Sequence, residues 1–446
     1  MVFNQVLKNS RHPKLMSQIL RFREPVPKEK GSNASTSKSL KLMLNEGFIK
    51  PVSPGLLSLM PLAVRSLEKL ICLVDAFMAN VNGQKVLFPS LVQRSLMKAS
   101  GRWDNNSNLF KLTDRSQNAY CLGATHEEIA TSLLSHLNIS YKILPLRLYQ
   151  ISSKFRDELN PKLGLLRGRE FIMKDMYTYD ANEENSEKTY VEICDAYEKL
   201  FNSLEIEFVK VVGSSGDIGG HSSHEFHVPS HIGEDEILVC PKCKTGYNIE
   251  VLSSDKNPKC ISCGLEFDRK NAIEIGHAFL LGTTYSKPFD ANYNSSNHSY
   301  ELLQMGCYGL GLSRILAASI ESLSTVDNIR WPLPLAPFQL CIIVPKKGSK
   351  EEPVTPFAVH LAECLNKIDW LNNNIVIDER TNLTIGKRLQ DASAIGIPFV
   401  IVVAGSALEE VPKVEVVDVY NSQTMFLTHK EILYYFRSKS LLNFQF

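Results

Sequence analysis

Two short runs decide the fold: Phe155-Arg156-Asp157-Glu158 and Arg167-Gly168-Arg169-Glu170-Phe171-Ile172-Met173-Lys174-Asp175. The residues between them include Pro161 and Gly164, so the pattern predicts two strands joined by a turn. Charged side chains stand inside these runs, where burial is costly unless they are paired or bind a charged ligand. Two arginines directed into one cleft suit a polyphosphate, since a guanidinium binds phosphate oxygens in pairs. The alternative is a salt-bridged hairpin on the surface.

Length and composition describe an ordinary globular protein. The chain has 446 residues and a net charge of +1, so it should hold two or three domains, and any RNA contact must come from a local patch. No apolar run approaches the roughly 18 residues of a membrane span, and we expect no membrane association. Of the 10 cysteines, four are clustered in pairs, which indicates metal rather than a disulfide scaffold.

The N-terminus differs from the rest of the chain. Residues 1–23 contain basic but no acidic residues, interleaved with apolar ones. That is the character of an organelle transit peptide, although a basic terminus that carries no targeting signal has the same composition. We expect residues 1–30 to form a presequence and linker, residues 31–330 a main domain and residues 336–446 a second domain.

Next in the chain, the apolar positions of residues 62–78 follow helical spacing, as do those of residues 182–204 further on, and Val86-Leu87-Phe88-Pro89 indicates a strand. Pro89 lacks a backbone donor, so this strand should lie at a sheet edge or an interface. The unit is either part of a dimer interface or a simple piece of the core.

A strand should then lead into a helix at Cys121–Glu128. Thr125 and Glu128 have the spacing of a capping box, which leaves Glu127 without a structural role. A glutamate beside a strand end could bind an ammonium group.

Two CxxC pairs, sixteen residues apart, follow a glycine-rich turn at residues 213–220. Each pair offers two thiolates to a tetrahedral ion, so the spacing predicts a structural zinc site within an insertion at residues 236–275; the alternative is four free thiols. The expected ligands are Cys240, Cys243, Cys260 and Cys263.

Glycines recur in Gly306-Cys307-Tyr308-Gly309-Leu310-Gly311-Leu312-Ser313-Arg314, before an apolar helix. They would let a flat ligand lie against the backbone, and Arg314 at the helix start could reach a phosphate. A glycine-rich strand packed under a helix is the structural alternative. Beyond the proline-rich residues 325–337, the pattern alternates between strands and helices, which predicts a compact α/β domain. The four strands are expected at residues 340–344, 375–377, 399–403 and 414–419, and the three helices near residues 355–366, 384–394 and 428–437.

These motifs together resemble those of the class II aminoacyl-tRNA synthetases. The run from Phe155 to Phe171 resembles their motif 2, Gly306–Arg314 their motif 3, and the helix ending at Pro89 their dimer motif, motif 1. The finer sequence around Thr125–Glu127, residues 219–226 and Gly306–Gly309 resembles the bacterial and organellar prolyl-tRNA synthetases, from about residue 40 to the end.

The resemblance implies an α+β fold: an antiparallel catalytic sheet flanked by helices, followed by a C-terminal α/β anticodon-binding domain. It implies a homodimer that activates L-proline with ATP and Mg²⁺ and transfers it to tRNA(Pro). Arg156 and Arg314 would be catalytic, and Arg156 would hold the α-phosphate. Further ATP contacts would come from Glu158, Arg167, Phe171 and Arg314.

Proline would be held by the Thr125–Glu127 loop and by residues shaping the pocket: Thr125, Glu127, His224, Phe226 and Cys307. In the C-terminal domain, acidic and basic groups together suit the edges of unstacked bases. The anticodon contacts would be Glu379, Arg380 and Lys387; a solvated helix face is the alternative for Lys387.

One departure from the bacterial pattern concerns editing. Only the stretch from Val228 to Met305 is available where bacterial enzymes often insert an editing domain, which is too short for a separate domain of typical size. We therefore expect no editing in cis and, with the basic N-terminus, a location in the mitochondrial matrix rather than the cytoplasm. The competing assignments are another class II enzyme, such as a threonyl-tRNA synthetase, and a non-catalytic RNA- or DNA-binding relative. The retained arginines argue against the latter.

Overall fold

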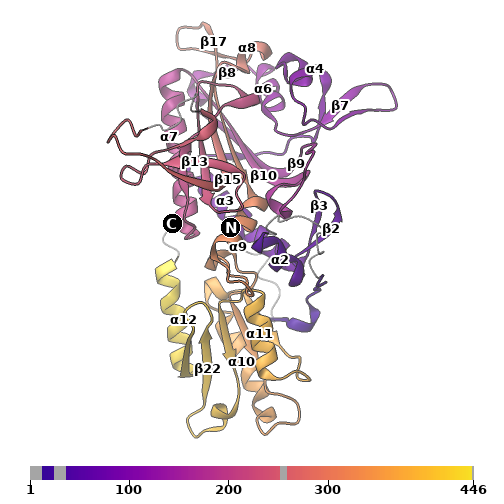
Figure 1. Ribbon diagram of the computed structural model, residues 1–446, viewed down its shortest axis with the longest axis vertical. Coiled ribbons are helices and arrows are strands. Elements are labelled where there is room, and N and C mark those ends of the chain that lie inside the picture. Colours follow the sequence, from indigo (N-terminus) through magenta and orange to yellow (C-terminus); the bar gives the residue numbers. More distant parts are fainter. Residues whose placement is uncertain (1–12, 25–36, 252–258, 444–446) are drawn as a thin grey trace.

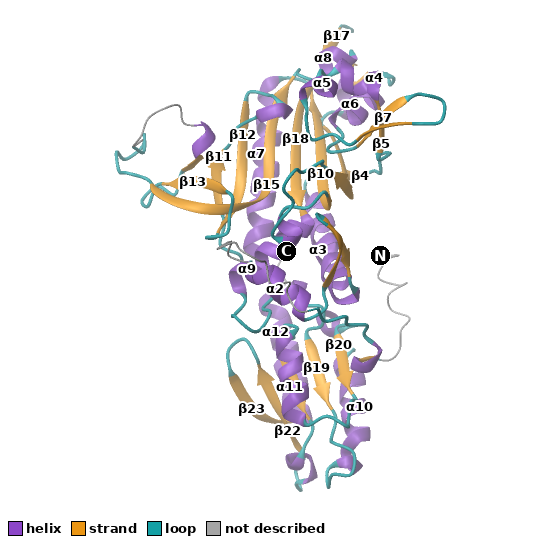
Figure 2. Ribbon diagram, turned by 45° about the vertical axis from the view of Figure 1, so that its right-hand side comes forward, coloured by secondary structure: helices purple, strands orange, loops and turns teal. Residues whose placement is uncertain are grey.

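The structure is a computed structural model that describes residues 13–24, 37–251 and 259–443. It has an elongated shape in which a large sheet with its helices lies above a smaller domain (Figure 1). The smaller domain is built mainly from the described residues after 338 and lies below the large sheet, as Figure 2 also shows.

Nine strands form the large sheet, in the order β12-β11-β14-β13-β15-β18-β10-β9-β4. Neighbours are antiparallel except where β4 meets β9 and where β11 meets β14. The expected hairpin is confirmed, with Phe155 opposite Glu170 next to the connecting turn. The strands are β4 (Gln84–Lys85), β9 (Leu146–Phe155), β10 (Glu170–Asp180), β11 (Val209–Val212), β12 (Ser222–Pro229), β13 (Asp235–Val239), β14 (Gly246–Asn248), β15 (Asp268–Gly282) and β18 (Gln304–Gly311).

Helices cover one face of this sheet, and the main core lies between them and the strands. The expected helices at 62–78 and 182–204 are confirmed as α3 and α7, and the strand–helix unit at Arg314 as β18 and α9. Even-numbered residues of β10 and β18, such as Met176 and Tyr308, pack into this core. Because side chains alternate along a strand, the odd-numbered residues face the other way. The helices are α2 (Lys38–Asn45), α3 (Pro61–Asn80), α7 (Glu183–Ser203) and α9 (Leu312–Leu323).

Short elements surround the open face and the edge of the sheet. They form a hairpin, two three-stranded sheets and several one- to three-turn helices. Their bounds are β2 (Ile49–Ser53), β3 (Leu56–Leu59), β5 (Leu91–Gln93), α4 (Arg94–Ala99), α5 (Arg102–Asn105), β6 (Lys111–Thr113), β7 (Ala119–Leu122), α6 (Glu127–Ser135), β8 (Ile139–Ser140), α8 (Ser286–Phe289), β16 (Asn292–Asn294) and β17 (Tyr300–Leu302).

The C-terminal domain is the expected α/β unit, with strand order β1-β20-β19-β21-β22-β23. Its four predicted strands and three predicted helices are present, and β23 is an addition that the largely exposed residues 423–428 did not indicate. The elements are β1 (Lys14–Leu15), β19 (Leu340–Ile343), α10 (Thr355–Leu365), β20 (Ile375–Asp378), α11 (Ile385–Ala394), β21 (Phe399–Val402), β22 (Lys413–Asp418), β23 (Gln423–Thr428) and α12 (His429–Asn443).

Residues 13–24 pack against the rest of the protein. We assigned them to a presequence and linker at residues 1–30, but β1 pairs with β20 and Met16 is only 3% exposed. Arg23 bridges the two parts of the molecule, with Nη2 3.1 Å from Glu46 and 3.2 Å from Asp391. A basic segment can therefore be structural when carboxylates of the fold face it. Residues 1–12 and 25–30 of that assignment lie outside the described residues.

The strand expected at Val86–Pro89 is also displaced. The ladder ends at Lys85, and only the Val86 N–H continues it, donating to Tyr149 O at 2.8 Å. The edge position is confirmed, because β4 is the last strand of the nine. Leu87 is 77% exposed, so an apolar side chain faces solvent beside this edge.

A buried lysine yields a stability prediction. Lys174 on β10 is fully buried, donates to Tyr308 O at 3.0 Å and to the Tyr197 hydroxyl, and burial lowers its pKa to about 7. An unfolded lysine titrates near about pH 10.4. Between these values the unfolded chain binds more protons, so wild-type stability should rise by up to about 1.4 kcal/mol per pH unit.

Lys174→Met removes this titration. The free energy of unfolding of the variant minus that of wild type should fall between about pH 7 and 10 and stay level below that range. Urea unfolding at a series of pH values measures it, with the 68%-exposed Lys188→Met as control. A difference that does not change with pH would contradict a neutral Lys174 in the folded state.

Candidate active site

A cavity of about 250 Å³ opens on the face of the sheet opposite α7. It brings together most of the residues expected from the sequence, which come from the loop before α6, from β9 and its turn, and from β10, β18 and α9. Odd-numbered residues of β10 and β18 form its floor, as the strand alternation requires. The expected residues that line it are Thr125, Glu127, Arg156, Phe171, Cys307 and Arg314.

Glu127 is fully buried at one wall of the cavity, in contact with a buried arginine that we did not single out from the sequence. Arg102 Nη1 lies 2.8 Å from Glu127 and 3.2 Å from Glu128, and Nη2 donates to Thr125 Oγ1 at 2.9 Å. Burial alone would raise the pKa of Glu127, but the charge of Arg102 and hydrogen bonds from Thr125 and Cys307 hold it below its usual range. Burial and the neighbouring Glu127 raise the pKa of Glu128.

One cation thus faces two carboxylates, and Glu127 is the one on the cavity. Thr125 is not the helix cap that we expected: His126 occupies that position, and the Thr125 hydroxyl donates to Glu127 instead. Arg102 lies on the single-turn helix α5, where no periodic pattern marks it. A lone arginine beside Trp103 is the only signal that the sequence offers.

Beneath Glu127, a second buried network fixes the loop. Lys154 Nζ lies 2.8 Å from Asp175 and 2.9 Å from His126 Nδ1, and Tyr177 donates to Asp175 at 2.7 Å. Burial would raise the pKa of Asp175, but the charge of Lys154 and the hydrogen bond from Gln150 keep it below its usual range. His126 also contacts the strand region before it, with its Nε2 3.1 Å from Pro89 O.

Cys307 closes the floor between these groups. Its thiol donates to Glu127 Oε1 at 3.2 Å. Burial, and then the charge of Glu127, raise the pKa of the thiol well above its usual value. Cys307 is therefore a small neutral donor at neutral pH, not a nucleophile.

Arg156 is the cation of the cavity whose guanidinium can still bind a ligand. Its guanidinium lies over the Phe171 ring, 5.0 Å from the centroid. Among the described residues, this guanidinium has no hydrogen-bond or ion-pair partner. Burial and the nearby charge of Arg314 lower its pKa, but an arginine stays protonated over the whole physiological range.

Arg314 is already oriented by the protein. It donates through Nη1 to Glu274 O and Oε2 at 2.8 and 3.0 Å, and through Nε to Leu166 O at 3.1 Å. Burial raises the pKa of Glu274, but the hydrogen bond with His277 and the charge of Arg314 outweigh it and hold the pKa below its usual range. Glu274 sits inside the long, alternating β15, where its position was not distinguishable from an ordinary surface carboxylate.

Two expected ATP contacts, Glu158 and Arg167, line an adjoining cavity of about 180 Å³ that shares Glu274 and Arg314 with the first. Arg167 binds Glu158 at 2.8 Å and Glu234 at 2.7 Å. It must give up those carboxylates before it can bind a phosphate.

Asp157, to which we assigned no role, donates its N–H to Asn108 O at 2.9 Å, which makes it part of the loop scaffold.

His224 and Phe226 do not line the cavity, contrary to the expectation that they shape a proline pocket. His224 Nδ1 lies 2.8 Å from the Tyr190 hydroxyl of α7, and Phe226 packs edge-on against Tyr197 of the same helix. Both have the strand parity that faces the helices. His277 and Phe279 of the neighbouring strand β15 line the cavity in their place.

The four cysteines converge outside the cavity, in the insertion that carries β13 and β14. Each CxxC forms the same turn, in which the fifth residue donates its N–H back to the first cysteine carbonyl, Lys244 at 3.0 Å and Gly264 at 2.7 Å. All four sulfurs lie within 4.8 Å of one another. Thiolates arranged in this way fit a tetrahedral ion such as Zn²⁺.

The expected anticodon residues are largely occupied by the protein itself. Arg380 binds Asp378 at 2.6 Å and Asp391 at 2.9 Å, and Glu379 accepts the Met16 N–H at 3.1 Å. Lys387 is half exposed, 3.6 Å from Asp391. Of these three, Lys387 is the one that needs no rearrangement to contact a ligand.

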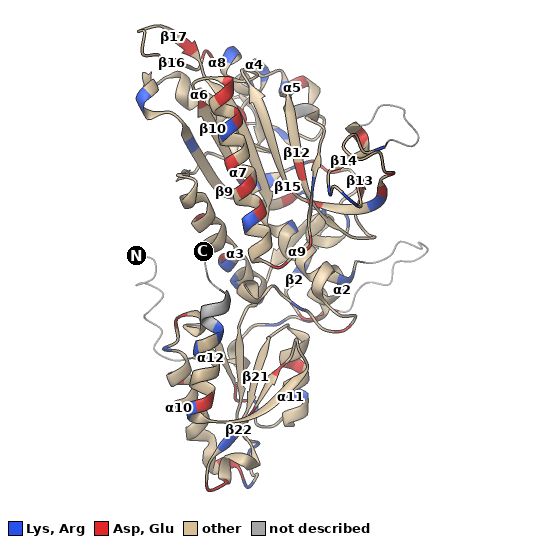
Figure 3. Ribbon diagram, turned by 90° about the vertical axis from the view of Figure 1, so that its left-hand side faces the viewer, with Lys and Arg blue, Asp and Glu red and all other residues tan. Residues whose placement is uncertain are grey.

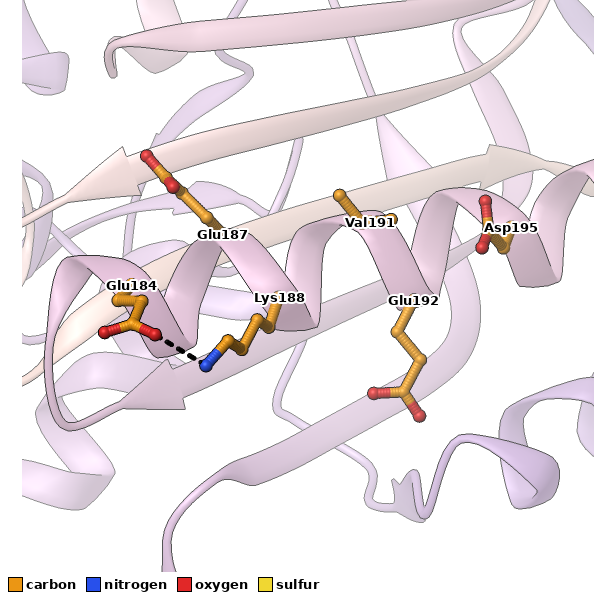
Figure 4. A pocket seen from close by; sticks show the side chains of 6 residues that line it. All are labelled: Glu184, Glu187, Lys188, Val191, Glu192 and Asp195. Atoms are coloured by element: carbon orange, nitrogen blue, oxygen red, sulfur yellow. Dashed lines mark hydrogen bonds and ion pairs between the residues drawn. The ribbon is translucent and has the colours of Figure 1, made fainter.

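A shallow depression along α7 has a different character. Figure 4 shows its acidic side chains, with Lys188 bound to Glu184 at 2.7 Å. Acidic positions recur along this helix in Figure 3. The ion pair is 68–76% exposed, as on a solvated helix face, and nothing there converges on a ligand.

Comparisons with known proteins show which family the chain is similar to. Residues 110–323 match the family "tRNA synthetase class II core domain (G, H, P, S and T)", and residues 339–439 match "Anticodon binding domain". A probable mitochondrial proline–tRNA ligase of Rattus norvegicus is 46% identical over 419 residues, which is 93% of this chain and 88% of the rat protein. A proline–tRNA ligase of Ehrlichia chaffeensis is 34% identical over 400 residues, 86% of this chain and 92% of that protein.

A solved structure shares the fold. The prolyl-tRNA synthetase of Giardia lamblia in complex with prolyl-adenylate superposes with a TM-score of 0.74 at 17% identity, covering 91% of this chain and 81% of that one. This likeness concerns the fold alone. With the rat relative matched over most of both sequences, the chain belongs to the proline–tRNA ligase family of class II tRNA synthetases.

Proposed function

We propose that this chain is a mitochondrial proline–tRNA ligase, which forms prolyl-adenylate from L-proline and ATP and transfers the prolyl group to tRNA(Pro). The observation that carries the proposal is one cavity holding both a carboxylate in excess of its cation, Glu127, and an unpaired guanidinium, Arg156. The first suits the ammonium of an amino acid and the second a phosphate.

Proline would bind at Glu127. Its secondary ammonium supplies the positive charge that Arg102 alone does not, and it can donate to Glu127 and to the Thr125 hydroxyl. The neutral Cys307 and the ring of Phe279 leave an uncharged floor for the pyrrolidine ring. Thr125, Glu127 and Cys307 are thus the proposed proline contacts, joined by His277 and Phe279 in place of His224 and Phe226.

ATP would bind along Phe171, with Arg314 at the same cavity. A carboxylate oxygen of proline attacks the α-phosphorus, the bond to the β-phosphate oxygen breaks, and pyrophosphate leaves. Arg156 would stabilise the charge that grows on the α-phosphate oxygens. No side chain needs to remove a proton, because the attacking carboxylate is already ionised, so catalysis consists of positioning and charge stabilisation.

Arg167 and Glu158 would act at the outer end of the ATP site, where the adjoining cavity continues past Arg314. Glu274 and Glu158 offer carboxylate oxygens of the kind that Mg²⁺ prefers. Bound with ATP, Mg²⁺ would neutralise phosphate charge. In the second reaction the 3′-hydroxyl of tRNA attacks the prolyl carbonyl, and AMP leaves.

The remaining parts of the proposal concern partners and structure. We infer that the C-terminal domain binds the anticodon through the surface around Glu379, Arg380 and Lys387. The four-cysteine insertion would hold structural Zn²⁺. We further infer that the chain acts as a homodimer, and the sheet edge at β4 with exposed Leu87 beside it supports an interface there.

Proline-dependent exchange of pyrophosphate into ATP tests the activity. Among the twenty amino acids, proline should give the largest exchange rate. Arg156→Ala should lower that rate by about 10²–10³-fold, as for other single donors to a transition-state oxyanion. Arg156→Lys should be intermediate, because the charge remains and the paired donors do not. The exposed Arg115→Ala is the matched control. An Arg156→Ala variant with wild-type exchange would contradict the phosphate role.

Glu127→Gln tests the ammonium site. Losing a charge-assisted hydrogen bond should raise KM for proline by about 10- to 100-fold, with little change in KM for ATP. Glu128→Gln is the matched control, since Glu128 contacts the same arginine but does not line the cavity. Equal effects of Glu127→Gln on both KM values, with stability unchanged, would remove Glu127 from the proline site.

Editing gives a further prediction. The described residues between Val228 and Met305 form β13, β14, β15, the short elements around β16 and β17, and the cysteine insertion, with no further domain among them. Alanine lacks only part of the proline ring, and a missing methylene changes binding by only about 1–3 kcal/mol. The purified protein should therefore form Ala-tRNA(Pro) slowly and leave it intact. Measured deacylation faster than the spontaneous rate would refute this.

A further inference from the structure

A second group of metal-binding residues lies in the C-terminal domain, far from the cysteine insertion in the sequence. His360 and Cys364 are one turn apart on α10, and His429 is the first residue of α12. The two helices lie side by side (Figure 3). In the part of the chain that the structure describes, this group and the four cysteines are the two sets of side chains close enough to hold an ion.

The spacing of the ligand atoms fits a tetrahedral ion. His360 Nε2 lies 3.5 Å from Cys364 Sγ. Bond lengths of about 2.0–2.1 Å for Zn–N and about 2.3 Å for Zn–S place two tetrahedral ligands about 3.5 Å apart. One ligand atom from each of the three residues lies within 4.8 Å of the others, so small rotations of His429 complete the set.

His429 provides an independent sign that a partner is missing. Its Nε2 is buried and has no hydrogen-bond partner among the described residues. Its ring stacks against that of His360, with centroids 5.9 Å apart and planes 20° apart, and Phe357 packs against its edge. A buried polar nitrogen is normally satisfied, and an ion would satisfy this one.

The backbone around His429 is fixed. Thr428 and Glu431 form a capping box at the start of α12, with the Thr428 N–H donating to Glu431 at 2.8 Å. His360 and Cys364 are held by the helix geometry of α10, which puts residues four apart on the same face. The three ligands therefore do not rely on mobile loops.

We propose that His360, Cys364 and His429 form a second zinc site, separate from the four-cysteine insertion. A thiolate with two imidazoles is a ligand set that suits Zn²⁺, and the fourth position is left for water or an added ligand. The ion would join the start of α12 to α10. Since Ile432 and Phe436 of α12 complete the core of the C-terminal domain, this link would hold the last helix on the sheet.

Metal content of the full-length protein tests the site. Wild type, dialysed against buffered Zn²⁺, should contain two zinc ions per chain, one for each group. His360→Gln and Cys364→Ser should each contain one, and so should Cys243→Ser, which removes a ligand from the other group. Cys72→Ser and His136→Gln are the matched controls, because neither residue belongs to a group, and both should keep two.

Cobalt identifies the ligands. In wild type loaded with Co²⁺, the visible spectrum should contain a component with one thiolate that Cys364→Ser abolishes and that Cys243→Ser leaves. His360 is exposed, so His360→Gln should fold normally, with proline-dependent exchange unchanged. One zinc ion per wild-type chain that Cys364→Ser retains and Cys243→Ser loses, or two in folded His360→Gln and Cys364→Ser, would overturn the proposal and leave a Cys–His hydrogen bond as the whole contact.

Discussion

Arg102 compensates only one of the two buried carboxylates that it contacts, and the chemistry of the cavity depends on that imbalance. A buried ion is tolerated only when it is paired, so the cluster holds Glu127 ionised while the protein is empty and leaves it able to receive a cation. A second arginine would neutralise the site. Without Arg102, burial would raise the pKa of Glu127 until it became a neutral donor. The Lys154–Asp175–His126 network beneath fixes the loop that carries Glu127.

Because side chains alternate along a strand, one face of the sheet builds the core and the other lines the cavity. On β10 and β18, residues of one parity meet α7 and build the core, and residues of the other parity line the cavity. This explains why Lys174 hydrogen-bonds within the core while its neighbour Asp175 supports the site. For the same reason, a conspicuous run such as residues 219–226 does not place all of its side chains in the cavity, since half of any run on a strand faces away from the ligand.

The sequence predicted the elements whose signals are local. The β9–β10 hairpin, α3, α7, the cysteine insertion and the C-terminal α/β domain follow from periodicity, turn residues and spacing. The grouping of Arg156, Glu127 and Cys307 in one site was instead an implication of the resemblance to the class II synthetases. Arg102 could not be found, because a single-turn helix has no period and its partners are 25 and 26 residues away. His224 and Phe226 were misplaced because the register of β12 is set by tertiary pairing. The contacts of residues 13–24 could not be predicted, because a basic segment gives no sign of the carboxylates that face it.

The three arginines of the site differ in the ion pairs that they already make within the protein. This difference determines which contacts must change when ATP binds. Arg314 is paired with Glu274 through Nη1 and bonded to Leu166 O through Nε, so among the described residues its Nη2 is left for a phosphate without breaking that pair. Arg156 lies unpaired above Phe171 and has no ion pair to break. Arg167 is bound to Glu158 and Glu234. The pair with Glu234 is partly exposed, at 39% and 32% for the two side chains, and exchanging it for a phosphate costs little, since a surface ion pair contributes only about 0–1 kcal/mol. Binding energy from the outer phosphates can therefore reorganise the turn after β9 while the inner pair of arginines keeps the geometry that the reaction needs.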